Sequence, residues 1–350
     1  EKKYLNRLIF DEVLSTFLIN SNIKKNFKRR SKIPKKIIKN IVNLTEKKIG
    51  FKLTLDQTKA VSEINSDITS NHRMFRLLQG DVGSGKTIVS LISAKNVIYS
   101  KYQVAFMAPT EILAKQHYNL FLKIFGKTVN AKILTGKTDY KEKKVIHTGL
   151  ENGNIEIVFG THSLFQKKIK FKKLGLIIVD EQHKFGVNQR KKLSEKGDTN
   201  CDVLVMSATP IPRTMMMTLY GDMDVTLIKS KPQNRKEIKT YTKDVNKIND
   251  VINFIKKEIS NNNQIFWVCP LIEESKKIDH QSSVKRFEYL TQVFKDEVGL
   301  IHGSLKKDDK EKILDKFLKN KIKVLVSTTV IEVGIDFPNA TCIVIEDSNK

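Results

Sequence analysis

The chain has 350 residues and a mass of 40.2 kDa, a length that suits about two domains of ordinary size. Hydrophobic residues make up 40% and charged residues 29%, which excludes a wholly disordered chain. The sequence contains no run of about 18 apolar residues, the length that a membrane-spanning helix requires. Lysine and arginine outnumber aspartate and glutamate by 63 to 38, and this excess supports a polyanionic partner such as nucleic acid without proving it, since 54 of the 63 are lysine.

Residues 1–50 are expected to form a basic, helical connector. A break at Ile33-Pro34 separates two stretches in which apolar residues follow helical spacing. The basic run at 27–32 is compatible with a solvated loop or with a nucleic-acid contact. The apolar positions of the two expected helices are Leu5, Leu8, Ile9, Val13 and Phe17, and then Ile37, Ile38, Ile41 and Val42.

From residue 51 onward, short apolar runs alternate with segments of helical length. Continuous apolar runs of this kind are typical of strands that are buried on both faces, so they predict a parallel sheet covered by helices. The predicted strands are Met74–Leu78, Val104–Met107, Ile155–Phe159, Leu176–Val179 and Val203–Met206.

A polar, proline-containing stretch at 229–235 predicts a linker, after which the alternation begins again. Strands are predicted at Ile238–Tyr241, Gln264–Val268, Val298–Ile301, Lys323–Val326 and Cys342–Ile345, and helices at Val245–Ile259, Val284–Phe294 and Lys307–Leu318. The expected organisation is therefore a connector at 1–50, a first α/β domain at 51–230 and a second at 231–350. We expect the second domain to be incomplete, because no helix follows its last strand.

Cys201, Cys269 and Cys342 are isolated in the sequence and odd in number. Because they form no C-x-x-C pair, their spacing predicts neither a disulfide framework nor a zinc site. We expect three small hydrophobic side chains in a reducing compartment.

Residues 80–87 match the phosphate-binding pattern G-x-x-x-x-G-K-[ST] at every position, between a predicted strand and a predicted helix. Its glycines allow backbone N–H groups to turn toward phosphate oxygens, Lys86 would reach the β- and γ-phosphates, and Thr87 would ligate Mg²⁺. The predicted phosphate-binding residues are Gly80, Gly83, Ser84, Gly85, Lys86 and Thr87.

Two acids, Asp180 and Glu181, follow the predicted strand at 176–179. The carboxyl ends of parallel strands border the ligand crevice, so we expect both acids beside the phosphate-binding loop. Asp180 would hold Mg²⁺ through water, and Glu181 would orient and deprotonate an attacking water. On its own, a strand that ends in acids is also compatible with a capped turn. His183 fits a polar relay beside the nucleotide, since its spacing from His162 and His117 matches no metal-ligand pattern.

These motifs carry a family resemblance. Residues 180–183, Asp-Glu-Gln-His, resemble the DExH box of superfamily 2 helicases, and residues 207–209, Ser-Ala-Thr, resemble their third motif. The strings at 78–87, 107–114, 180–187, 207–214, 268–275 and 328–336 are similar to those of RecG-type DNA helicases. The nearest alternative is the transcription-repair coupling translocase, which typically carries Glu at the position of Gln182 and a bulkier residue at that of Ser84.

The resemblance implies two RecA-like lobes that hydrolyse ATP with Mg²⁺ and couple this to DNA translocation. It implies the remodelling of stalled replication forks and the branch migration of Holliday junctions in DNA repair and recombination. The implied partners are branched or duplex DNA and replication or repair proteins, for a monomer in the cytoplasm, associated with the nucleoid and not with a membrane.

The resemblance also implies roles for residues that match its motifs. Lys86, Asp180, Glu181 and His183 are the implied catalytic residues, and Ser207 and Thr209 would couple the ATP site to the DNA site. Gln57 would contact adenine, although a polar helix start explains it equally, and Gly334 and Asp336 would contact the nucleotide from the second lobe. The implied DNA contacts, each of which could also be an ordinary turn, are Pro109, Thr110, Thr135, Gly136, Thr161, His162, His302, Gly303, Thr328 and Thr329.

Two features of the family are expected to be missing from this chain: the sixth motif with its paired arginines, and the N-terminal wedge domain. We therefore expect the chain to bind ATP but to hydrolyse it poorly, and not to unwind junctions. Two other functions stay open, a transcription-coupled translocase that binds RNA polymerase and a non-catalytic nucleic-acid-binding module. A small-molecule P-loop kinase would not explain the second α/β domain.

Overall fold

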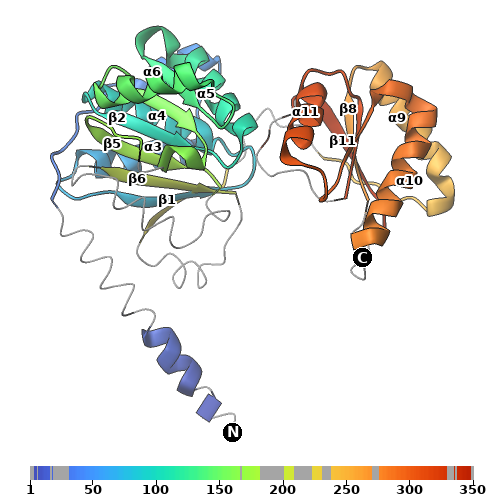
Figure 1. Cartoon of the computed structure of the whole chain (residues 1–350). Helices are drawn as coiled ribbons and strands as arrows, with labels where there is room; N and C mark the ends of the chain where they lie inside the picture. Colours follow the sequence, from blue (N-terminus) through green and yellow to red (C-terminus); the bar gives the residue numbers. More distant parts are fainter. Residues whose placement is uncertain are drawn as a thin grey trace. The chain divides into compact units, whose positions relative to one another are not determined.

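The structure is a computed structural model of the chain, and it divides into two compact units, residues 1–235 and 236–350 (Figure 1). The described residues are 4–5, 7–15, 18, 31–165, 168–181, 201–208, 223–230, 238–269, 276–328, 335 and 337–347. Each unit contains a parallel sheet with flanking helices. This confirms the predicted fold class of two RecA-like domains in tandem.

The first unit is built on a sheet whose described strands all run parallel. Their order across the sheet is β3-β4-β2-β5-β6-β1-β7, so that β1 lies near one edge and β3 forms the other. The strands are β1 (Phe75–Gly80), β2 (Gln103–Met107), β3 (Ala131–Leu134), β4 (Ile157–Gly160), β5 (Leu174–Val179), β6 (Asp202–Ser207) and β7 (Asp224–Ile228).

Both faces of this sheet are buried. The neighbours Leu77 and Leu78 in β1 belong to two different hydrophobic clusters, as successive side chains of a strand covered on both faces must. One cluster also contains residues of four helices, and the other contains Ile146 and Leu150 of a fifth. The helices are α2 (Ile41–Ile49), α3 (Leu55–Thr69), α4 (Lys86–Tyr99), α5 (Glu111–Phe125) and α6 (Tyr140–Glu151).

The second unit has a smaller parallel sheet with the order β11-β8-β10-β9. Its strands are β8 (Gln264–Val268), β9 (Val298–Ile301), β10 (Val324–Ser327) and β11 (Ala340–Ile345). Trp267 lies in its core with Ile255 of α9 (Ile248–Ser260) and Leu290 of α10 (Lys276–Phe294), and α11 (Lys307–Leu318) follows β9. None of the helices among the described residues combines the length and apolarity that crossing a bilayer requires.

The sequence predictions fail at the margins of the sheets. Strands β3 and β7 were not predicted, because these two edge strands are short or carry exposed residues among the apolar ones. The strand predicted at Ile238–Tyr241 is wrong: the described residues 238–244 form neither strand nor helix, and both of its apolar ends are exposed. The predicted helix at 37–42 begins only at Ile41.

The N-terminal region is helical at residues 4–5, 7–15 and 18, where its predicted positions Leu5, Leu8, Ile9 and Val13 are all exposed. Phe17 lies outside the described residues. The buried thiols of Cys201 and Cys269 have pKa values raised by burial to about 12, which keeps them protonated and unreactive. Cys342 is partly buried.

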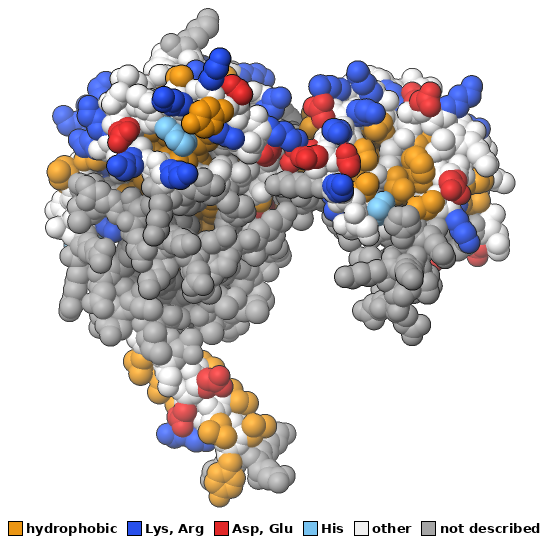
Figure 2. Space-filling model, viewed as in Figure 1, with side chains coloured by type: hydrophobic (Ala, Val, Ile, Leu, Met, Phe, Trp, Pro, Cys, Tyr) orange, Lys and Arg blue, Asp and Glu red, His pale blue; other side chains and the backbone are white. Residues whose placement is uncertain are grey.

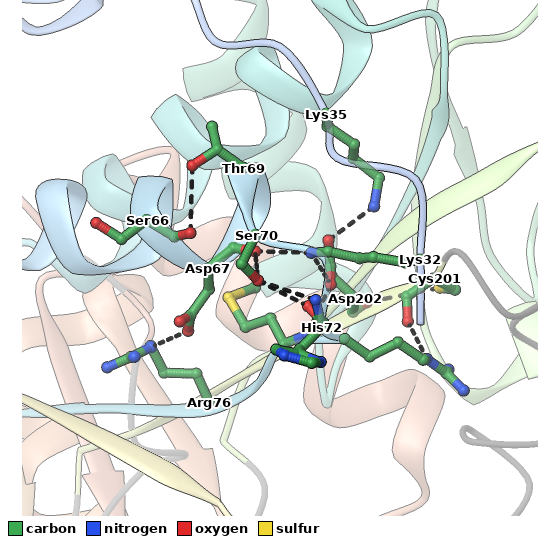
Figure 3. A network of polar contacts seen from close by, with 12 residues as sticks. Lys32, Lys35, Ser66, Asp67, Thr69, Ser70, His72, Arg76, Cys201 and Asp202 are labelled. Carbon is green, nitrogen blue, oxygen red and sulfur yellow. Dashed lines mark hydrogen bonds and ion pairs between the residues drawn. The ribbon is translucent and has the colours of Figure 1, made fainter. Parts of the chain in front are cut away.

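The extended segment 32–38 is anchored to the first unit by a buried ionic cluster (Figure 3). The Nζ atoms of Lys32 and Lys35 each lie 2.7 Å from a different carboxylate oxygen of Asp202, and all three side chains are fully buried. Lys32 also donates to the carbonyl of Asp67, and the amide of Met74 donates to Asp202. Burial lowers the pKa of Lys32, while the charge of Asp202 opposes that shift.

Replacing the carboxylate of this cluster should therefore be costly. Asp202→Asn leaves two buried ammonium groups facing a neutral amide, and we expect the free energy of unfolding to fall by about 3–5 kcal/mol in urea titrations. Glu151→Gln, at the exposed ion pair with Lys170, is the matched control and should change it by less than about 1 kcal/mol. Similar losses in the two variants would contradict this account of the cluster.

Candidate functional site

Apart from Gln57 in the first turn of α3, the candidate site residues of the first unit lie at or after the carboxyl ends of its strands. The phosphate-binding loop follows β1, Ser207 ends β6, and Asp180 follows β5, and these three strands are neighbours in the sheet. The strings that resemble DNA-contacting motifs follow β2, β4 and β3, which form the other part of the sheet. We call the part of this edge after β5, β6 and β1 the nucleotide half and the part after β2, β4 and β3 the nucleic-acid half, after the motifs that the sequence predicts there.

The phosphate-binding loop has the backbone that its glycines predict. Gly83 and Gly85 adopt φ angles of +76° and +89°, a region that favours glycine. A Cβ atom on Gly85 would lie 2.3 Å from Nε2 of Gln57, and one on Gly80 would lie 2.5 Å from Oγ of Ser84. The backbone conformation therefore favours glycine at positions 83 and 85, and close packing favours glycine at positions 80 and 85.

Lys86 begins α4 and lies within electrostatic reach of the acid pair. Its Nζ donates to the carbonyls of Gly80, at 2.7 Å, and Asp81, at 3.1 Å. Burial lowers its pKa, while the negative charges of Asp180, Glu181 and Asp81 oppose the shift. The loop and the acids after β5, separated by 92 residues (88–179) in the chain, are therefore brought together.

Gln57 packs against the same loop. It is buried and forms a capping box at the start of α3, where Thr54 accepts from its amide and its Oε1 accepts from the amide of Thr54. Its Nε2 donates to the carbonyl of Ser84 at 2.8 Å. Gln57 thus both starts the helix and holds the phosphate-binding loop.

The two acids after β5 are buried in a bend. The amide of Asp180 donates to the carbonyl of Met107 in β2 at 2.8 Å, which continues the pairing of β5 with β2. Glu181 has a φ of +50°, an unusual conformation for a residue with a side chain. Its amide donates to Oδ1 of Asp180 at 3.1 Å.

His117 of α5 is a polar neighbour of Asp180 that was not assigned a site role from the sequence. Its Nε2 lies 2.8 Å from Oδ2 of Asp180, and both side chains are buried. The available signal was its position seven residues, or two helical turns, after Thr110, which puts it on the same face of α5 as the start of that helix.

The residues present fit a nucleoside triphosphate with Mg²⁺. The hydroxyl of Ser84 is buried without a hydrogen-bond partner among the described residues, inside a loop whose Gly83 and Gly85 adopt positive φ angles. Thr87 lies at the N-terminus of α4, and Asp180 supplies the carboxylate oxygen that Mg²⁺ prefers. Lys86 donates to a carbonyl of the phosphate-binding loop and lies within electrostatic range of Asp180.

Polar contacts order some of the candidate positions in the nucleic-acid half of the edge. Thr110 caps α5 by accepting from the amide of Leu113, which leaves its hydroxyl proton free to donate. The carboxylate of Glu111 accepts from the amide of Gly136 at 2.9 Å. Pro109 precedes this helix, Thr135 follows β3, and Thr161 and His162 follow β4. Hydroxyls and amides of this kind suit phosphate contacts that read no sequence.

In the second unit, three candidates also gather at one sheet edge. His302 and Gly303 follow β9, and Thr328 follows the neighbouring strand β10. The amide of Thr328 donates to the carbonyl of Ile301. Five predicted site residues lie outside the described residues, namely His183, Thr209, Thr329, Gly334 and Asp336. The side chain of His162 is also outside the described part of the structure.

The segment that leaves β7 is held beside Gln57. One carboxylate oxygen of Asp56 accepts from the amides of Lys229, at 3.0 Å, and Ser230, at 2.7 Å. The hydroxyl of Ser230 donates to that of Thr54 at 2.9 Å. The start of α3 therefore contacts both the phosphate-binding loop and the segment that precedes the second unit.

The positive charge is dispersed over the face shown in Figure 2. In the described part of that face, lysines and arginines stand among acidic and apolar side chains and form no continuous basic patch.

Family models match both units. A DEAD/DEAH box helicase model matches residues 54–218, and a helicase conserved C-terminal domain model matches residues 246–350. The chain is 44% identical to the ATP-dependent DNA helicase RecG of Thermotoga maritima over 352 aligned residues, and 45% identical to that of Bacillus subtilis over 307. These alignments include 100% and 87% of this chain but 45% of each relative, so the chain spans less than half their length.

Solved structures agree with these matches. A structure of RecG bound to a three-way DNA junction superposes with a TM-score of 0.81 at 41% identity, over 97% of this chain and 44% of that one. Mss116p bound to single-stranded RNA and AMP-PNP superposes with a TM-score of 0.62 over 88% of this chain and 66% of that one; its 20% identity concerns the fold alone.

Gly85 provides a test of the loop. Gly85→Ala adds a Cβ that displaces Gln57 and also disfavours the positive φ, so we expect affinity for a fluorescent ATP analogue to fall by about tenfold or more, equivalent to about 1.4 kcal/mol. Gly50→Ala is the matched control, because Gly50 has a φ of +82° with open space around an added Cβ. It should lower stability but leave nucleotide affinity unchanged; equal affinity losses would refute the packing argument.

Asp56 predicts a pH dependence of stability. The amides of Ser230 and Lys229 hold its pKa below the ordinary range, so the folded state favours the charged carboxylate. A depressed pKa contributes stability that is present above about pH 5 and is lost as the pH falls through the lowered value. Urea unfolding between pH 3 and pH 7 should show wild type more stable than Asp56→Asn at pH 7, with the difference shrinking toward pH 3. A pH-independent difference would contradict this assignment.

Proposed function

Because the chain belongs to the RecG-type DNA helicases of superfamily 2, we propose that its two units are the lobes of an ATP-driven DNA motor. The observation that carries this proposal is that the loop with Lys86 and the acids Asp180 and Glu181 follow β1 and β5, which flank β6 in one parallel sheet, so that their charges interact. A lysine for the phosphates, with one acid for a metal ion and another for water, is the equipment of an NTP hydrolase.

In the proposed reaction, the loop amides and Lys86 hold the β- and γ-phosphates of ATP. Thr87 and, through water, Asp180 would hold Mg²⁺, which supplies neutralisation of the phosphate charge. Glu181 orients a water molecule and takes its proton as the water oxygen bonds to the γ-phosphorus and the bond to the β-phosphate oxygen breaks. His183 is proposed to be a polar relay beside this site.

DNA contact is proposed for the other half of the edge. Thr110, Thr135 with Gly136, and Thr161 with His162 would hold a phosphate backbone, and His302, Gly303, Thr328 and Thr329 would do so in the second unit. Ser207 and Thr209 would couple the halves, while Gln57, Gly334 and Asp336 would contact the nucleotide. Closure of the lobes on ATP and their reopening after hydrolysis would move the motor along a duplex arm.

Branched DNA is the proposed substrate of the whole protein. A relative 41% identical to this chain has been solved on a three-way junction, and a motor that contacts phosphates can work on duplex arms of any sequence. We extend this to remodelling of stalled forks and branch migration of Holliday junctions, by a monomer in the cytoplasm.

Glu181 separates a motor from a non-catalytic binding module. Glu181→Gln should lower ATP turnover in the presence of a three-way DNA junction by about 10²- to 10⁴-fold while ATP-analogue affinity changes little, because it removes the proton acceptor and not the phosphate contacts. Lys86→Ala should weaken both, and Glu151→Gln, on the exposed end of α6, should change neither. Unchanged turnover in Glu181→Gln would favour the binding module.

A further inference from the structure

We propose that His117 is a positioning residue that fixes the Asp180 carboxylate for Mg²⁺ and connects it to the helix that starts at the nucleic-acid half of the edge. This inference rests on the proposed function and deepens it. The contacts, burial and position of His117 each support one part of it.

The first support is that both oxygens of Asp180 are held. Oδ1 accepts from the amide of Glu181 at 3.1 Å, and Oδ2 lies 2.8 Å from Nε2 of His117. An ionised carboxylate only accepts, so His117 carries its proton on Nε2 and donates it. With both oxygens engaged, the carboxylate plane cannot rotate freely, and its remaining lone pairs point in set directions. Outer partners of this kind orient metal-binding carboxylates.

The second support is that His117 is itself immobilised. Its ring is buried, with its centroid 4.8 Å from that of Phe106 in β2. Phe106 stacks on Phe159 of β4 at 5.1 Å, and Phe121 of α5 packs on Phe159 at 5.5 Å. The imidazole therefore belongs to the aromatic core between α5 and the sheet. A donor anchored in this way can impose its direction on Asp180.

The third support is the helix that carries it. α5 starts at Thr110, and Glu111 in its first turn holds the amide of Gly136. The helix α5 thus begins at Thr110, a candidate DNA contact after β2, and contacts Gly136, a candidate DNA contact after β3. Through His117 it also contacts Asp180, the candidate metal ligand after β5. A shift of α5 on DNA binding would move or break the His117 contact, which provides a physical link between the two halves of the edge.

The test compares three substitutions at this position in the full chain. His117→Leu keeps volume against Phe106 but removes the donor, His117→Gln retains an amide donor of similar reach, and His117→Asn carries the same amide one methylene shorter. His147→Leu on α6 is the control. The primary measurement is the Mg²⁺ concentration needed for half-maximal binding of a fluorescent ATP analogue, with thermal unfolding to verify folding.

We expect His117→Leu and His117→Asn to raise that Mg²⁺ concentration by about 10- to 100-fold, and His117→Gln to stay close to wild type. Binding of the analogue in EDTA should be the same in all variants. If His117→Leu fails to fold, the comparison of Mg²⁺ dependence between His117→Gln and His117→Asn tests the inference by itself.

Wild-type Mg²⁺ dependence in both His117→Leu and His117→Asn would overturn the inference while leaving the proposed function intact. So would equal defects in the Gln and Asn variants, which would point to packing and not to the hydrogen bond. A wild-type chain that binds no ATP analogue would overturn the proposed function and this inference together.

Discussion

The parallel direction of the strands is the constraint on which every candidate site depends. It brings all carboxyl ends to one edge, so Lys86 after β1 and Asp180 after β5 come within electrostatic range of each other despite the 93 residues between them. Parallel strands are stable only when both faces are covered, and the separation of Leu77 and Leu78 into different clusters meets that requirement. The core and the site are therefore consequences of one arrangement.

The order of the strands then decides which motifs meet. Because β5, β6 and β1 are adjacent, the acids, Ser207 and the phosphate-binding loop share one half of the edge, while β2, β4 and β3 carry the other. β2 is next to β5, so α5, which follows β2, lies at the boundary. Because of that position, His117 can contact Asp180 of the acid pair although its helix begins at Thr110, in the motif predicted to contact DNA.

Buried charged side chains lie at both the amino ends and the carboxyl ends of the strands of the first sheet, with different consequences. Asp202 begins β6 and is neutralised by Lys32 and Lys35, so the amino edge contains a completed ionic cluster that anchors the preceding segment. At the carboxyl edge, Lys86 donates to the carbonyls of Gly80 and Asp81 in the described part of the chain, and Asp180 and Glu181 act on it through their charge. A buried cation held by neutral carbonyl groups suits an anionic ligand, whereas a paired cluster suits anchoring.

The amino-acid sequence by itself determined the family, the alternation of strands and helices and the phosphate-binding loop, because these follow from local patterns: apolar runs, glycine spacing and motif strings. It failed at β3 and β7, whose edge positions depend on pairing and not on composition, and at residues 238–241, whose apolar ends stay exposed. Only the tertiary structure decided that Gln57 holds Ser84, that Lys32 and Lys35 share Asp202, and that His117 contacts Asp180. Those contacts join residues far apart in the chain, and no local pattern specifies which buried polar groups will meet once the sheet is assembled.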